Sequence, residues 1–171
     1  MERVIIIGCG GAGKSTLARK LGEKTGLPVV HLDQLYWKPG WVETAKEEMN
    51  EIILREMEKP QWIMDGNYNR TLEKRLERCD TVIYLDFSAL ACLMGVLKRV
   101  ITNYGTVRPD MGEGCPERFD PEFMKWIWDF NKNKRKHYYE LLNAQKDKQV
   151  YILKSRRAVN KFLEQTGGPN V

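Results

Sequence analysis

An eight-residue segment near the start of the chain has the residue types and spacing of a phosphate-binding loop (P-loop). It matches the pattern G-x-x-x-x-G-K-[ST] in full, as Gly8, Cys9, Gly10, Gly11, Ala12, Gly13, Lys14 and Ser15. The glycines allow backbone N–H groups to curl around a phosphate without a clashing Cβ, and a helix that follows adds its positive dipole end. We expect Lys14 to reach the β- and γ-phosphates of ATP, the Ser15 hydroxyl to bind Mg²⁺, and Thr16 to complete the nucleotide-binding segment. An apolar strand before the motif and a helical pattern after it disfavour a chance match in a glycine-rich turn.

Aspartates follow three other expected strands. They are Asp33, Asp65 and Asp86. Each alone is equally well a helix cap or a turn residue, but ligands of open α/β sheets bind beyond the carboxyl ends of the strands. Three aspartates around a P-loop therefore favour a metal and acceptor site. Asp33 is the candidate to accept a proton from an attacking hydroxyl, Asp65 suits a magnesium–water ligand, and Asp86 is the weakest candidate of the three.

Arginines that could clamp a transferring phosphoryl group stand beside the longest irregular segment, residues 103–119. This segment holds three glycines and two prolines (NYGTVRPDMGEGCPERF), and its length is typical of a lid or binding loop. Arg108 precedes a proline inside it, which favours a functional role. Arg99 lies on an expected helix and is either a catalytic group or a solvated helix residue. Arg118 and Arg135 are further candidates.

Aromatic residues cluster in two places. Tyr36, Trp37 and Trp41 follow the second expected strand and surround a Lys-Pro-Gly turn, so we expect them to wall an acceptor pocket. Trp126 and Phe130 lie on a later helical pattern, where core packing is the favoured interpretation.

The elements that must position these groups alternate between strand and helix, which predicts a parallel α/β sheet. Apolar runs predict strands at residues 4–7, 29–32, 62–64, 82–85 and 150–153. Helical spacing predicts helices at residues 14–25, 44–59, 71–78 and 90–101, from 121 through 142, and at 159–163.

Length and composition fit a single domain over residues 1–171. Apolar residues make up 42% of the chain and charged residues 30%, which is typical of a globular protein. No apolar run approaches the ~20 residues of a membrane span. The four cysteines form no CxxC pair, so we expect a reducing, cytoplasmic environment. The net charge of +5 is concentrated in residues 132–161, where ten Lys and Arg face two acidic residues.

Six stretches together resemble the P-loop kinases of the adenylate kinase and shikimate kinase type, and more closely the bacterial family named DNA topology modulation proteins. They span nearly the whole chain in order: IIIGCGGAGKSTLARKL, LPVVHLDQLYWKPGW, WIMDGNY, LKRV followed by RPDMGEGCPERFD, KWIWDF, and YILKSRR. The family name describes a phenotype and not a reaction, so the resemblance indicates fold more than activity.

The resemblance implies a five-stranded parallel sheet in the order 2-3-1-4-5, flanked by helices. It also implies an acceptor-binding insert at about residues 34–60 and a LID at about residues 103–119 over the nucleotide. Arg156 becomes part of a wall for adenine, and Asp65-Gly66 is similar to the Asp-Gly of nucleoside monophosphate kinases. The resulting sites are catalytic Lys14, Asp33, Arg99 and Arg108; acceptor-binding Asp33, Tyr36, Trp37, Trp41, Asp65, Asn67, Tyr68 and Arg70; and metal-binding Ser15 and Asp65.

Two departures from the family pattern bear on activity. Gly95 stands four residues before Arg99, where the resemblance implies an arginine, so one phosphate clamp is missing. Residues 34–60 hold only one arginine and three lysines (Lys38, Lys46, Arg55 and Lys59) against six glutamates. A nucleoside monophosphate acceptor therefore lacks its usual cations, unless Arg70 substitutes for them.

Three functions fit the sequence. The favoured one is a kinase that uses ATP and Mg²⁺ on an unidentified small-molecule acceptor. The alternatives are an ATP-binding or ATPase regulatory module that affects DNA topology, and weak nucleic-acid contact through the basic C-terminal third, which no nucleic-acid motif accompanies. Asn131-Lys132-Asn133-Lys134 lacks the aspartate of the guanine motif Asn-Lys-x-Asp, so guanine specificity is rejected.

Overall fold

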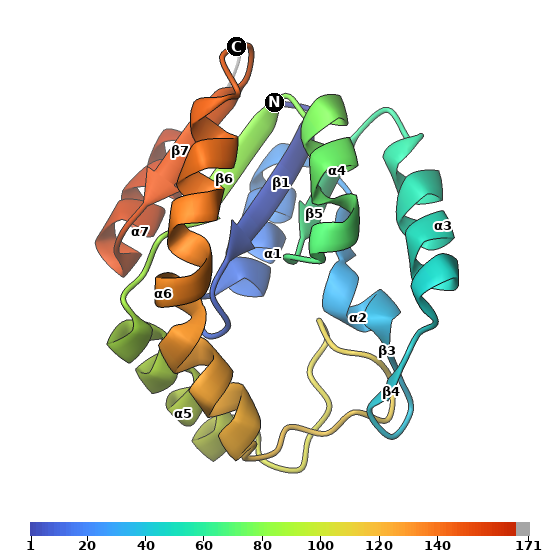
Figure 1. Ribbon diagram of the computed structural model, residues 1–171, viewed down its shortest axis with the longest axis vertical. Coiled ribbons are helices and arrows are strands. Elements are labelled where there is room, and N and C mark those ends of the chain that lie inside the picture. Colours follow the sequence, from blue (N-terminus) through green and yellow to red (C-terminus); the bar gives the residue numbers. More distant parts are fainter. Residues whose placement is uncertain (167–171) are drawn as a thin grey trace.

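Five parallel strands form one sheet at the centre of the protein (Figure 1). The computed structural model describes residues 1–166. The strands are β1 (Arg3–Gly8), β2 (Val29–His31), β5 (Trp62–Asp65), β6 (Thr81–Leu85) and β7 (Gln149–Leu153), and they are ordered β2-β5-β1-β6-β7. These are the five expected strands in the expected order 2-3-1-4-5, so the predicted fold class is confirmed.

Helices cover both faces of the sheet. In Figure 1, α4 (Leu72–Arg78) and α6 (Pro121–Asn143) lie in front of it, and α1 (Lys14–Thr25) and α7 (Arg156–Gln165) lie behind it. The remaining long helices are α3 (Lys46–Met57) and α5 (Ala89–Asn103), and α5 packs on α6. Because both faces are covered, the central strands are apolar throughout, and Val4 to Ile7 are 0–1% exposed.

Helix boundaries follow local capping chemistry. Asp120 accepts a hydrogen bond from the Phe123 N–H at the start of α6, and Pro121 occupies its first turn, as the sequence predicts. Ser155 caps α7 through the Ala158 N–H, so this helix begins earlier than expected. α1 ends at Gly26, whose φ of 75° is readily available to glycine.

The segment after β2 differs from the prediction. β2 ends at His31, and Leu32 begins a five-residue helix, α2 (Leu32–Tyr36). A hairpin of two short strands follows, β3 (Trp37–Lys38) and β4 (Val42–Glu43). Asp33 therefore lies in the first turn of α2 and not directly at a strand end. Thr44 closes the hairpin through its N–H to the Tyr36 carbonyl, which delays the start of α3 to residue 46.

The expected LID segment packs against this hairpin. Between α5 and α6 the chain forms no helix or strand, apart from an isolated bridge of Tyr104 to Glu117. The Gly40 N–H donates to the Gly114 carbonyl at 3.1 Å, and the Cys115 Sγ lies 3.2 Å from the Lys38 carbonyl. Figure 1 shows the loop, in yellow, beside β3 and β4. Residues 103–119, the expected LID, are thus in direct contact with the hairpin that follows α2.

A buried arginine holds the turn that follows β5. The Arg75 guanidinium donates to the carbonyls of Gly66, Asn67 and Tyr68 at 3.0, 2.7 and 3.0 Å. Its side chain is fully buried, and this burial lowers the pKa of Arg75 to about 10, which keeps it charged at neutral pH. Arg75 therefore fixes the backbone path of a segment that contributes to the cleft described below.

We expect Arg75→Met to lower the free energy of unfolding by about 3 kcal/mol, because three turn carbonyls lose a charged donor. Urea unfolding measures this effect. The matched control is Arg78→Met on the same helix, where the side chain is exposed and the change should be within about 0.5 kcal/mol. Equal losses in the two variants would contradict the role assigned to Arg75.

Candidate functional site

The P-loop connects β1 to α1 and is held by side chains from elsewhere in the chain. Its turns use Gly8, Gly11 and Gly13, whose φ values are 145°, 78° and 94°. The Asn67 side chain bonds both sides of Gly8, accepting from its N–H at 3.0 Å and donating to its carbonyl at 2.9 Å. Asn67 lines the cleft, as predicted for an acceptor residue, but its amide is already engaged with the P-loop backbone.

Two cations touch the P-loop backbone. The Lys14 ammonium donates to the Cys9 carbonyl at 3.1 Å. Arg156, from the start of α7, donates to the carbonyls of Ala12 and Gly11 at 2.7 and 3.0 Å, and its guanidinium lies 5.1 Å from the centre of the Phe87 ring. Arg156 was expected beside adenine, and the structure places it on the P-loop itself.

The P-loop also packs closely on α5. A Cβ added to Gly95 would lie 2.3 Å from the Gly11 carbonyl oxygen, and one added to Gly11 would lie 2.2 Å from the Cys92 carbonyl oxygen. A side chain at either position would force the helix and the loop apart. The close contact of α5 with the P-loop therefore requires glycine at residue 95. An arginine there, as in the family pattern, would clash with the P-loop backbone.

One large cavity of about 630 Å³ opens between the P-loop, α2, the hairpin and the LID segment. It brings together most of the predicted site residues: Gly10, Gly11, Gly13, Lys14, Ser15, Thr16, Asp33, Tyr36, Trp37, Trp41, Asn67, Tyr68, Arg99, Arg108 and Arg156. Five predicted residues do not line it: Gly8, Cys9, Ala12, Asp65 and Arg70. The first three are buried in the loop, and Arg70 is exposed.

Asp65 is occupied by a partner that the sequence did not suggest. His31 and Asp65 are neighbours across β2 and β5, and the Nδ1 and Oδ2 atoms of the pair lie 2.5 Å apart. Both side chains are buried, with Asp65 4% exposed. Among residues 1–166, no group of three or more His, Cys, Asp or Glu side chains is placed to hold a metal ion.

Asp33 lines the cavity, and its side chain is exposed to solvent there. Desolvation by the protein around it raises the pKa of Asp33 above its ordinary value, and the nearby charges of Asp65 and Asp110 act in the same direction. Lys14 and Arg108 oppose the shift. The structure therefore places Asp33 within electrostatic reach of both the P-loop lysine and the LID arginine.

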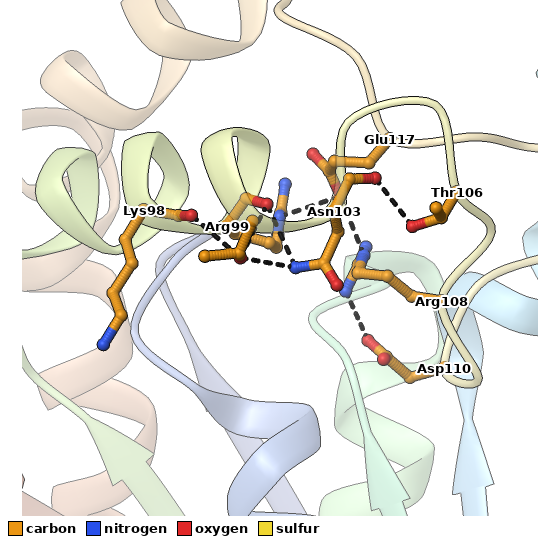
Figure 2. A network of polar contacts seen from close by, with 8 residues as sticks. Lys98, Arg99, Asn103, Thr106, Arg108, Asp110 and Glu117 are labelled. Atoms are coloured by element: carbon orange, nitrogen blue, oxygen red, sulfur yellow. Dashed lines mark hydrogen bonds and ion pairs between the residues drawn. The ribbon is translucent and has the colours of Figure 1, made fainter.

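Two carboxylates that sequence reasoning missed, Glu117 and Asp110, pair with Arg99 of α5 and Arg108 of the expected LID segment (Figure 2). The Glu117 Oε2 forms ion pairs with the Nε atoms of Arg99 and Arg108, at 3.0 and 2.8 Å. Arg108 also pairs with Asp110 at 2.6 Å. Glu117 is only 4% exposed. Burial and the neighbouring charge of Arg108 lower the pKa of Arg99, while Glu117 opposes this shift. The one signal in the sequence was acidic residues within an arginine-bearing loop.

Other candidates have structural partners. The buried Asp86 pairs with Arg135 at 2.7 Å and accepts a hydrogen bond from the Tyr139 hydroxyl at 2.8 Å, so it connects α6 to the end of β6.

The core prediction for Trp126 is wrong, because Trp126 is 43% exposed, lines the cavity and stacks on Phe123. Phe130, one turn further along α6, takes the core position that was expected for both.

Because Glu117 is the shared partner of two arginines, we expect Glu117→Gln to leave them repelling each other. Breaking these largely buried pairs should lower the free energy of unfolding by about 3 kcal/mol. Hydrogen exchange should also become faster across residues 103–119. Glu113→Gln, an exposed change in the same loop, is the control. Unchanged exchange in Glu117→Gln would mean that this network does not order the loop.

The known proteins that this chain resembles in sequence or structure are kinases with a P-loop fold. No family model matches the chain. Over 80 residues it is 30% identical to the adenylate kinase of Thermotoga neapolitana, and the match covers 47% of this chain. The chain spans only 36% of the length of that enzyme. The resemblance to DNA topology modulation proteins stays a prediction.

Two shikimate kinases have similar solved structures. One is from Acinetobacter baumannii, in complex with shikimate, with a TM-score of 0.63, 16% identity, and 96% of this chain and 90% of that chain covered. The other is from Bacteroides thetaiotaomicron, with a TM-score of 0.57, 15% identity, and coverage of 96% and 95%. No helix in residues 1–166 has the length and apolar character of a membrane span. The fold of this chain is that of the P-loop kinases.

Proposed function

We propose that the protein is an ATP-dependent phosphotransferase that moves the γ-phosphate of ATP to a hydroxyl of a small-molecule acceptor. The observation that carries this proposal is the position of Asp33. It lines the same cavity as the P-loop, close enough to Lys14 and Arg108 for their charges to act on its pKa. A carboxylate at this place can also activate water in an ATPase, so it is the aromatic pocket beside Asp33 that favours an acceptor hydroxyl over water.

The roles follow from charge and placement. The P-loop backbone and Lys14 would hold the phosphates of ATP, while Arg99 and Arg108 would offset charge that develops on the transferring group. As the acceptor oxygen bonds to the γ-phosphorus, the bond from phosphorus to the bridging oxygen breaks and ADP leaves. Asp33 takes the proton of the acceptor hydroxyl. Its raised pKa suits this task, because a base works best with a pKa near the operating pH.

Mg²⁺ fits the residues available, since hydroxyl and carboxylate oxygens are the ligands it prefers and it keeps several waters of its own. Ser15 lines the cavity and would hold the ion through its hydroxyl. The predicted metal role of Asp65 does not fit, because this carboxylate is buried, paired with His31 and outside the cavity lining. The ion would neutralise charge on the phosphates.

Asp33→Asn separates this proposal from the alternative of an ATPase regulatory module. We expect the variant to bind ATP within a few-fold of the wild type but to lose a factor of about 10²–10⁴ in phosphoryl transfer, the usual contribution of a general base. Single-turnover transfer from γ-labelled ATP to a metabolite extract measures the rate, and a separate titration measures affinity. Asp147→Asn, a change at a side chain that is 76% exposed, is the control.

The pH dependence provides a second readout of the same substitution. Because the folded pKa of Asp33 is raised, its base form is lost as the pH falls through that raised value. The transfer rate should therefore decline on an acid limb that lies above the ordinary aspartate range, and Asp33→Asn should remove this limb. Loss of ATP affinity would instead assign Asp33 to the metal site. Unchanged transfer would make Asp33 a structural residue.

A further inference from the structure

We propose that the acceptor is an uncharged molecule with a flat aromatic or heteroaromatic body and a free hydroxyl, of the nucleoside type, and not a phosphorylated or carboxylated compound. This inference rests on the proposed phosphotransferase function. It names the class of molecule that the walls beside Asp33 would recognise.

Aromatic rings form the wall next to Asp33. Tyr36 lies one helical turn after Asp33 on α2, and its ring meets Trp37 edge-on at 4.8 Å and Tyr68 at 6.0 Å. Trp37 in turn meets Trp41 at 5.5 Å. All four rings line the cavity and are only partly buried. Such a set of faces and edges favours a planar ring, which stacks on any of them.

Trp41 occupies its position at a cost to stability. Its φ of 65° lies in the left-handed region, which no other residue except glycine adopts in the described part of the chain. Trp41 is the last residue of the three-residue loop between β3 and β4 and directly follows Gly40, which has a φ of 79°. Glycine or asparagine usually takes such a position, because a bulky side chain is strained there. The indole N–H is also buried without a hydrogen-bond partner. A strained backbone and an unpaired hydrogen-bond donor at the same residue are typical of a binding site, where the side chain contacts a ligand.

Cations on this side of the cavity already have partners. Lys38 pairs with Glu48 at 2.7 Å, outside the cavity lining. Arg118 stacks over the Trp41 ring at 4.8 Å and lies 3.8 Å from Asp120. Arg19 is on α1, the helix that begins at the P-loop, so it stands on the nucleotide side. No arginine or lysine of residues 1–166 is thus placed as a dedicated clamp for an acceptor phosphate.

The charges around the whole cavity agree with this. Its lining holds six cations, namely Lys14, Arg19, Arg99, Arg108, Arg118 and Arg156, and four carboxylates, namely Asp33, Asp110, Glu117 and Asp120. The excess of two positive charges matches the roughly two negative charges of ATP with bound Mg²⁺. A phosphate monoester would add about two more. These two negative charges would lie in a cavity with Asp33, Asp110 and Asp120 and with no cation left to neutralise them. An uncharged acceptor adds no negative charge.

The test is a matched panel of acceptors: the four common ribonucleosides, their 5′-monophosphates, and shikimate as an anionic, non-aromatic alcohol. With γ-labelled ATP and Mg²⁺, at least one ribonucleoside should be phosphorylated with a kcat/KM at least about tenfold above that of its monophosphate and of shikimate. A preference for a monophosphate or for shikimate would overturn the inference while leaving the phosphotransferase intact.

Binding gives a readout that does not depend on turnover. In the presence of a non-hydrolysable ATP analogue, ribonucleosides should quench tryptophan fluorescence at concentrations at least about tenfold below those needed for monophosphates. Trp41→Gly, which also relieves the backbone strain, should weaken this binding at least about tenfold and leave affinity for the ATP analogue within about twofold, both measured by titration calorimetry because the variant lacks one fluorophore. Trp128→Gly is the control, because Trp128 is 61% exposed and outside the cavity lining.

The failure of this inference is distinct from the failure of the proposed function. No quenching by any ribonucleoside, or equal effects of Trp41→Gly and Trp128→Gly, overturns the acceptor class. ATP hydrolysis without labelled transfer to any component of a metabolite extract overturns the phosphotransferase itself.

Discussion

The cleft depends on how the P-loop backbone is held from outside. Asn67 bonds to both sides of Gly8, and Arg156 bonds to the carbonyls of Gly11 and Ala12. Asn67 is in turn fixed by Arg75 through the backbone of the same turn. Residues that follow β5 and β7 thus hold the P-loop at two separate points. These contacts join side chains to backbone groups of the P-loop, so they fix the path of its backbone.

The second organising feature is a balance of charge inside the cavity. Glu117 and Asp110 hold Arg99 and Arg108 in place, and Asp33 lines the same cavity with a raised pKa. A carboxylate whose pKa is raised by folding opposes the stability of the fold at neutral pH, and the solvent exposure of Asp33 keeps this cost small. Such local costs are typical of sites whose chemistry requires them. The strained Trp41 belongs to the same pattern.

Sequence reasoning reached the parts of the fold that have strong local signals. The P-loop, the five apolar strands and the Asp120-Pro121 helix start could be read from residue types and spacing, and the strand order came from the family resemblance. The hairpin was missed because strands of two residues leave no alternation to detect. Trp126 was assigned to the core because an apolar helical stripe does not by itself distinguish residues that face the core from residues that face a cleft.

The remaining misses are tertiary. Nothing local marks Arg75 as buried on a helix rich in charge, or pairs His31 with Asp65 across two strands. Glu117 meets Arg99 and Arg108 only because the LID segment folds back toward α5. These residues hold the elements around the cavity in place, and each contacts a partner that lies on another element of the fold.

The central claim is that the P-loop and Asp33 face the same γ-phosphate. A crystal structure with Mg²⁺ and a non-hydrolysable ATP analogue tests it most directly. The account predicts the phosphates within the P-loop, the γ-phosphate directed toward Asp33, and open space for a hydroxyl between the two. A γ-phosphate directed away from Asp33, or Asp33 bound directly to the metal, would contradict it.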